Sequence, residues 1–175
     1  METDSTIKTS EGEGKSPQTK EQAFEALMLR HKALIWHLCS DFRMDSVYTV
    51  EDKMQEVVCS LWQYFDTFEG RSSERTWVYR VSVSTLLMLA RKRRIETAPI
   101  DEVATDSLAD EVEHDAYQHL RQCIELLPET DRVVLRAHLD GFSYVEIGKI
   151  THVTVPAVAM RLTKAKHKLR QMMLK

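Results

Sequence analysis

The side chains of this 175-residue chain that could do chemistry are cations and aromatics, and they gather in two segments. Residues 71–94 carry seven Lys or Arg and one acid, and residues 161–175 carry six cations and no acid. Residues 96–115 carry eight Asp or Glu and neither Lys nor Arg. The formal net charge of -3 therefore hides a separation of charge that is typical of a protein touching a polyanion at two places. The alternative for either basic segment alone is an ordinary solvated helix face.

Catalysis and metal binding are disfavoured by the pattern of reactive side chains. The sequence shows no nucleophile–base pair, no glycine-rich phosphate loop and no clustered carboxylates, so we expect neither an enzyme nor a cofactor. Cys39, Cys59 and Cys123 are odd in number and lack CxxC spacing, which predicts reduced thiols in a reducing compartment. His119 and Cys123 lie one helical turn apart, but a zinc site needs further ligands at such spacing, so we expect no metal.

The most informative stretch is 141–169, which predicts two short helices joined by a tight turn. Ser143 and Glu146 have the spacing of a capping box at the start of the first helix. Thr154 is a suitable N-cap for the second helix, and Pro156 is tolerated only in a first helical turn. A protruding second helix with small residues at its start and cations along its length suits the DNA major groove. Its candidate DNA contacts are Thr154, Val155, Ala157, Met160, Arg161 and Lys164.

Helical periodicity dominates the rest of the chain. Gly and Pro total only nine, and apolar residues recur at three-and-four spacing, so we predict an all-α protein. A second helix is expected to begin after Thr49, and a third is expected over about 73–94, anchored by Trp77, Val81, Met88 and Leu89. These elements predict two small helical domains joined by a flexible acidic linker, and the C-terminal domain contains the helix-turn-helix. The expected divisions are a disordered tail at 1–20, a first domain at 21–95, the linker at 96–115 and a second domain at 116–175.

Three stretches in order resemble bacterial sigma-70 family RNA polymerase sigma factors of the extracytoplasmic-function (ECF) group. The sequence VEDKMQEVVCSLW at 50–62 is close to that family's AED-x-x-QE-V-x-x-x-LW signature. The sequence FEGRSSERTWVYR at 68–80 is similar to its F-x-G-x-S-x-x-x-TW-L-Y-R stretch, and residues 127–169 look like its promoter-reading domain. The chain departs from the family at Ser84 and Met88 on the third helix, and at His152, Pro156 and Ala157 around the recognition turn.

The resemblance implies a partner for the second helix. In the family the matching face binds core RNA polymerase through a coiled coil of the β′ subunit, and the β flap is a further contact. The residues that match this face are Glu51, Asp52, Gln55 and Glu56. A carboxylate there can accept charge-assisted hydrogen bonds from Arg on the partner. From its pattern alone, the same polar face could also be merely solvated.

The resemblance also divides the basic segments between two promoter elements. The 68–94 segment would hold one unstacked strand of the -10 element, since aromatics stack on bases and cations hold the backbone. The candidates are Phe68, Arg71, Ser72, Arg80, Arg91, Lys92, Arg93 and Arg94. Trp77 is expected in the core instead. The helix-turn-helix candidates would read the -35 element, with Arg161 on phosphate or guanine.

Two other functions compete with a sigma factor that recognises both elements and helps melt the -10 region. One is a stand-alone helix-turn-helix regulator that binds DNA as a dimer on a palindrome, and the other is a helical adaptor that binds only protein. We expect a cytoplasmic protein, since no signal peptide or membrane-spanning run is visible. The sequence leaves open the promoter sequence, the inducing signal, an anti-sigma factor as a further partner, and whether the linker enters the RNA-exit channel.

Overall fold

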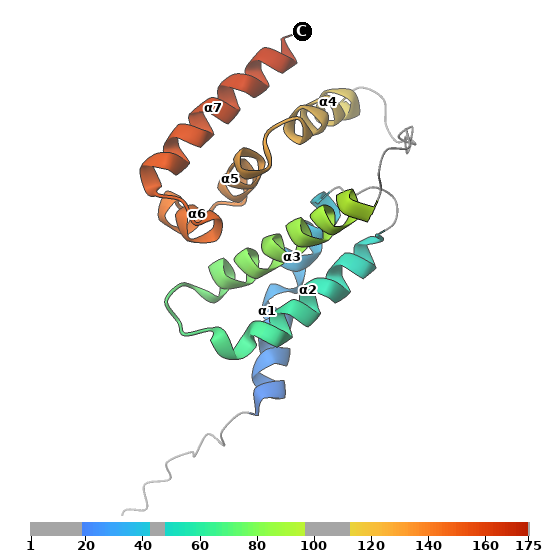
Figure 1. Cartoon of the computed structure of the whole chain (residues 1–175), viewed down its shortest axis with the longest axis vertical. Helices are drawn as coiled ribbons and strands as arrows, with labels where there is room; N and C mark the ends of the chain where they lie inside the picture. Colours follow the sequence, from blue (N-terminus) through green and yellow to red (C-terminus); the bar gives the residue numbers. More distant parts are fainter. Residues whose placement is uncertain (1–18, 43–47, 97–112, 175) are drawn as a thin grey trace, which may run out of the picture.

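The chain forms seven α-helices and one 3-10 turn within residues 19–42, 48–96 and 113–174, which the computed structural model describes (Figure 1). No strand is present in these ranges, as the all-α prediction requires. The helices are α1 (Lys20–Asp41), α2 (Val50–Tyr64), α3 (Glu74–Glu96), α4 (Glu113–Glu125), α5 (Glu129–Leu139), α6 (Tyr144–Thr151) and α7 (Val155–Met173), and the turn η1 (Phe65–Thr67) follows α2.

Capping boxes define where three helices begin. Ser143 caps α6 as predicted: its hydroxyl accepts from the Glu146 backbone N–H, and the Glu146 carboxylate accepts from the Ser143 N–H. Thr19 and Thr49 do the same for α1 and α2. Each cap satisfies backbone N–H groups that have no partner inside the helix. Thr154 occupies the N-cap position of α7, but its side chain makes no capping hydrogen bond.

The first three helices pack around a shared apolar stripe. Ile35 of α1, Val57 and Leu61 of α2, and Leu86 of α3 are completely buried. Burying a side chain of this size stabilises the fold by roughly 1.5–3 kcal/mol. Lys53 is also buried, and its Nζ donates to the Phe42 carbonyl oxygen at 3.0 Å, so a lysine satisfies the end of α1.

The last four helices form the second group, in which α7 lies against α4, α5 and α6. Val134, Ile147 and Val158 are completely buried in this group. The turn between α6 and α7 depends on Gly148, where an added Cβ would lie 2.8 Å from the Val153 carbonyl oxygen. His152 ends α6 in the left-handed conformation with φ 56°. The helix-turn-helix is therefore present and tightly turned.

Some expectations about the elements need correction or lie outside the described residues. The apolar periodicity predicts Met88 as a core anchor of α3, but its side chain is 58% exposed because it lies on the outer face of the helix. Helix α4 begins at Glu113, inside the stretch assigned to the linker. The expected disordered tail falls mainly on 1–18 and the acidic linker mainly on 97–112, both outside the described residues. No helix in the described ranges is long and apolar enough to span a membrane.

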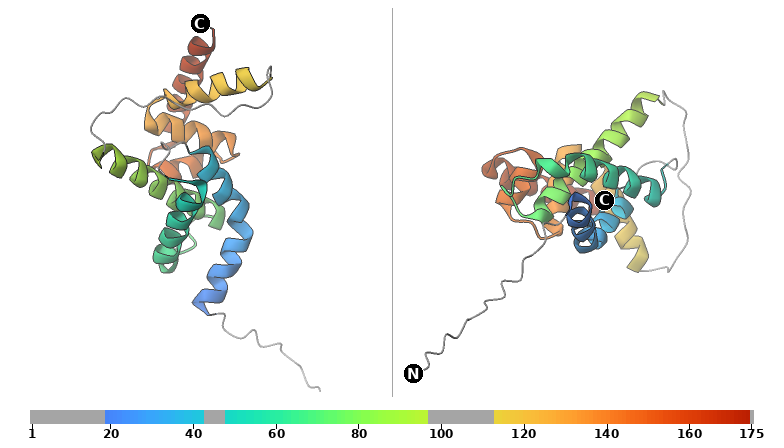
Figure 2. Two further views of the ribbon diagram at one scale, coloured as in Figure 1. Left: turned by 90° about the vertical axis from the view of Figure 1, so that its right-hand side faces the viewer. Right: turned by 90° about the horizontal axis from the view of Figure 1, so that it is seen from below.

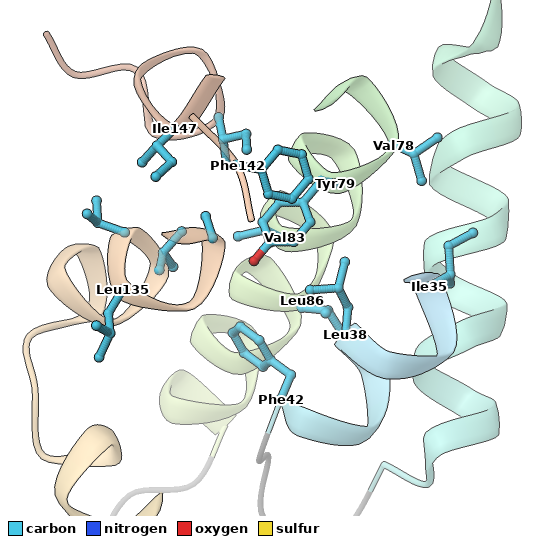
Figure 3. Close-up of a cluster of buried hydrophobic side chains, with 14 of the residues drawn as sticks. Ile35, Leu38, Phe42, Val78, Tyr79, Val83, Leu86, Leu135, Phe142 and Ile147 are labelled. Carbon is cyan, nitrogen blue, oxygen red and sulfur yellow. The ribbon is translucent and has the colours of Figure 1, made fainter. Parts of the chain in front are cut away.

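The two groups of helices touch along α3, which lies against α6 (Figures 1 and 2). Tyr79 of α3 and Phe142, which precedes α6, meet there with ring centroids 4.6 Å apart, and both are buried (Figure 3). The buried apolar residues of both groups form one continuous cluster. The whole described chain therefore packs as a single closed body.

Candidate nucleic-acid interface

A hollow of about 530 Å³ lies at the loop between α2 and α3. Trp77 forms its buried floor and is 2% exposed, as expected for a core residue. The Phe68 ring lies over Trp77 with centroids 5.3 Å apart. Arg71, Ser72 and Arg80 complete the wall, so the structure brings together four of the -10 candidates. An apolar floor with cations at the rim suits an unpaired base and its phosphate. The hollow is named the loop pocket below; its lining residues are Thr67, Phe68, Glu69, Arg71, Ser72, Thr76, Trp77, Arg80, Lys149 and His152.

The helix-turn-helix supplies one side of the loop pocket. Lys149 Nζ donates to the Arg71 carbonyl oxygen at 2.9 Å, and His152 of the recognition turn also lines the hollow. The Arg71 side chain itself forms an ion pair with Glu69. In this closed arrangement, Lys149 and His152 of the C-terminal group thus form one wall of the loop pocket.

Asp140, at the end of α5, holds the two groups of helices together. The Tyr79 hydroxyl donates to Asp140 Oδ2 at 2.7 Å, and His37 Nε2 lies 3.2 Å from Oδ1. Arg75 Nη2 donates to the Asp140 carbonyl oxygen at 2.5 Å, and the Arg75 guanidinium lies over the Phe142 ring. Burial and the neighbouring Asp140 charge both raise the pKa of Tyr79, so its hydroxyl remains a donor. The sequence singled out none of these pairs.

A second polar contact lies one turn away. Thr76 Oγ1 donates to Glu146 Oε1 at 3.0 Å, which joins α3 to the start of α6. The hydroxyl and backbone N–H of Ser143, and then Thr76, lower the pKa of Glu146 by hydrogen bonding its carboxylate. The capping carboxylate of α6 therefore also contributes to the contact between the two groups.

The recognition helix α7 presents most of its candidate side chains to solvent. Thr154, Val155, Met160 and Lys164 are exposed, and Ala157 and Arg161 are half-buried. Arg161 Nη1 bonds Asp131 Oδ1 at 2.7 Å, and the Asp131 side chain is only 5% exposed. Arg161 thus has a structural partner inside its own domain. Three of its five N–H donors lie on other nitrogens of the guanidinium, so the pairing leaves donors for DNA.

The polar face of α2 is exposed at Glu51, Asp52, Gln55 and Glu56. One of the four has a local role, because Asp52 Oδ2 accepts from the backbone N–H and the hydroxyl of Thr49, each at 2.9 Å. These bonds lower the pKa of Asp52, the backbone bond most. The Thr49-x-x-Asp52 spacing could have revealed this cap from the sequence.

The basic end of α3 is only partly described. Arg91 and Lys92 are exposed, and Arg91 forms an ion pair with Glu129 at the start of α5. The side chains of Arg93 and Arg94 lie outside the described residues. Elsewhere in the described ranges, no group of three or more His, Cys, Asp or Glu lies close enough together to hold a metal. Cys39 and Cys123 are buried, and Cys59 is exposed on α2.

A helix-turn-helix joined to a three-helix body with a basic, aromatic loop pocket is typical of a DNA-binding protein. Comparison with known families agrees: residues 27–95 match sigma-70 region 2 and residues 117–169 match sigma-70 region 4. The chain belongs to the sigma-70 family of RNA polymerase sigma factors, in its ECF group. It is therefore a factor that directs RNA polymerase to promoters, and its family consists of non-catalytic initiation factors.

Individual relatives support this assignment. The chain is 28% identical over 162 residues to the ECF RNA polymerase sigma-E factor of Escherichia coli K12. The matched region covers 83% of this chain and 84% of the relative. It is 26% identical over 168 residues to the ECF sigma factor SigW of Bacillus subtilis, covering 86% and 89%.

The fold is similar to two proteins whose structures were solved in complexes. One is RpoE with the anti-sigma factor NepR from Bartonella quintana, with a TM-score of 0.67, 18% identity, and 86% of this chain and 96% of that chain covered. The other is CnrH with the cytosolic domain of CnrY, with a TM-score of 0.62, 20% identity, and 87% and 88% covered. A stand-alone regulator and a protein adaptor are not favoured, because neither accounts for a region 2 match joined to a region 4 match.

Proposed function

We propose that the exposed face of α2 binds the β′ coiled coil of core RNA polymerase through Glu51, Asp52, Gln55 and Glu56. The exposure of all four supports this proposal, since their side chains are accessible to a large partner. Carboxylates on such a face can pair with Arg on the partner. Polymerase binding places the action of the factor in the cytoplasm.

Gln55 and Glu56 give the cleanest test of this face. Asp52→Ala would also remove the carboxylate half of the α2 capping box, whereas Gln55→Ala with Glu56→Ala leaves the box intact. We expect the double variant to bind core polymerase at least tenfold more weakly in a fluorescence titration. Glu25→Ala on α1, also an exposed acid, is the control. Equal affinity of the double variant and the wild type would refute the proposed interface.

We infer that the loop pocket receives an unpaired base of the -10 element. Its aromatic floor and its rim of Arg71, Ser72 and Arg80 support this function, and Arg91 to Arg94 would contact phosphate further along α3. Arg80→Ala with Ser72→Ala should reduce promoter melting, as permanganate footprinting would show. Unchanged thymine reactivity would contradict this assignment.

We infer that α7 reads the -35 element with Thr154, Val155, Ala157, Met160, Arg161 and Lys164. Small and apolar side chains at the exposed start of α7 can touch a thymine methyl, and Lys164 can contact phosphate. Met160→Ala should weaken the -35 footprint of the holoenzyme without altering the -10 footprint. The β flap is the polymerase surface that we assign to this domain.

Promoter binding requires the closed body to open. The two promoter elements lie about 25 base pairs apart, or ~85 Å at ~3.4 Å per base pair. In the closed body α3 and α6 are in contact, so one conformation cannot place both DNA-binding surfaces on their elements. We therefore infer that domain separation accompanies polymerase and promoter binding. The two domains predicted from the sequence, 21–95 and 116–175, would then be the two bodies that separate.

We propose an anti-sigma factor as a further partner. RpoE was solved with the anti-sigma factor NepR, and CnrH was solved with the cytosolic domain of CnrY. Run-off transcription with purified core polymerase and a library of genomic fragments tests the function as a whole. We expect new, specific start sites that appear only when this chain is added. If start sites do not change, the proposed residue assignments lose their basis.

A further inference from the structure

A second hollow runs between α2 and α3 and continues the loop pocket. It has a volume of about 330 Å³, and it shares four lining residues with the loop pocket, Thr67, Trp77, Arg80 and His152. Its further lining includes Tyr64 of α2 and Ser84 and Met88 of α3. We call this second hollow the strand groove. A strand leaving the loop pocket would enter it directly.

Tyr64 and Met88 of the strand groove present apolar surface to solvent. Tyr64 is 48% exposed and Met88 is 58% exposed. The other aromatics nearby are engaged, because Trp62 and Phe65 both pack edge-on against Phe24. No comparable ring contact involves Tyr64 among the described residues, so the face of its phenol is available to a partner.

The arrangement of charge favours nucleic acid over a protein helix as the occupant. Arg80 lies where the two hollows meet, so a backbone phosphate can pair with it while the bases on either side enter the pocket and the groove. Aromatic rings bind bases without reading their hydrogen-bonding edges, because every base has a π face. Thioether side chains adapt to irregular apolar surfaces in a similar way.

We propose that Tyr64 is a stacking platform for the unpaired base adjacent to the base in the loop pocket, and that Met88 extends this apolar surface along the strand. This proposal rests on the proposed function of the loop pocket. At the position beside the inserted base, recognition would depend on stacking strength and not on hydrogen bonds to the base edges. Purines would therefore bind better than pyrimidines at this position.

His152 of the recognition turn also lines the strand groove in the closed body. The separation of the two domains removes this side chain from the groove. The platform is therefore best measured in the assembled complex of this chain with core polymerase, in which we infer that the domains are apart.

The test measures binding of holoenzyme to fork-junction DNA whose non-template strand is unpaired through the -10 element. We expect Tyr64→Ala to weaken binding by about 5- to 150-fold and Tyr64→Phe to restore it, since phenylalanine keeps the ring. Trp36→Ala is the matched control, because Trp36 is an aromatic of α1 with the same 48% exposure. It should leave binding unchanged.

A scan of abasic sites through the unpaired strand identifies the stacked base. At one position adjacent to the inserted base, loss of the base should weaken wild-type binding and abolish the difference between wild type and Tyr64→Ala. The platform would be overturned if Tyr64→Ala bound more weakly than wild type at every abasic position. It would also be overturned if Tyr64→Ala and wild type bound the intact strand equally.

Two further outcomes separate this proposal from others. If Tyr64→Ala lowers affinity for core polymerase itself, Tyr64 belongs to the polymerase interface and the platform is refuted. If the wild-type holoenzyme itself fails to bind the unpaired -10 strand, the proposed function of the loop pocket fails, and the platform with it.

Discussion

Removing the hydroxyl group of Tyr79 should shift the protein from the closed body toward a state in which the two groups of helices are apart. This hydroxyl donates to Asp140 Oδ2 at 2.7 Å across the contact between the two groups of helices, and Tyr79 is 1% exposed. Tyr79→Phe keeps the ring against Phe142, whose centroid is 4.6 Å away, and deletes only the hydrogen bond. In an open state the hydroxyl would bond water instead, so its deletion would destabilise the closed state selectively.

The expected size follows from the acceptor. A hydrogen bond to a charged group contributes a net ~1.5–3 kcal/mol. Each 1.4 kcal/mol changes an equilibrium constant tenfold, so the ratio of closed to open molecules should fall by about 10- to 150-fold. His37 lies 3.2 Å from the other oxygen of Asp140 and limits the loss toward the lower end of that range.

Spin labels can report this opening as a change in distance. Cys59 is exposed on α2 and accepts one label directly, and Lys168→Cys on α7 accepts the other, with the buried Cys39 and Cys123 replaced by Ala. In Tyr79→Phe, the population at long distances should grow by the stated ratio. Apparent affinity for core polymerase should rise with it if only the open state binds.

Tyr64→Phe is the control, since it removes the hydroxyl of an exposed tyrosine that makes no hydrogen bond to the other group of helices among the described residues. Identical distance distributions in Tyr79→Phe and the wild type would refute the reasoning. The Asp140 hydrogen bond would then contribute nothing to holding the domains together.

The remaining predictions concern stability. Arg161→Ala should lower the free energy of unfolding by ~1–3 kcal/mol, because it leaves the nearly buried Asp131 carboxylate without its partner. Adding Asp131→Asn to the same chain should reduce that loss. Urea unfolding measures both effects, and an unchanged midpoint in Arg161→Ala would mean that the pair is dispensable. The pKa of Glu146 is lowered in the folded state, so its stabilising hydrogen bonds are present above pH 4.5 and are lost as the pH falls through its folded-state pKa. In a pH series of thermal unfolding, Glu146→Gln should therefore reduce the loss of stability at acid pH. An unaltered pH profile would refute the role of Glu146. Leu61→Ala should destabilise the fold by ~2–5 kcal/mol, because Leu61 is completely buried, and a loss below ~1 kcal/mol in urea would contradict its place in the core.

The sequence by itself determined the local elements of this protein. Ser143 and Glu146 predicted the start of α6, and periodic apolar residues predicted the helices, because capping and periodicity act over one or two turns. The loop with Phe68 and Arg71 and the exposed face of α2 were also predictable, since local spacing decides which side chains share a helix face. The assignment of those faces to promoter or polymerase stays a prediction that the proposed experiments test.

Only the tertiary structure decided what those faces meet. Tyr79 and Asp140 are 61 residues apart, and Lys149 and Arg71 are 78 apart, so no local spacing encodes either pair. The burial of Tyr79, the partner of Arg161 and the exposure of Met88 likewise depend on how helices dock. Docking follows from the shapes of whole surfaces and from satisfying buried polar groups, which a one-dimensional pattern does not contain.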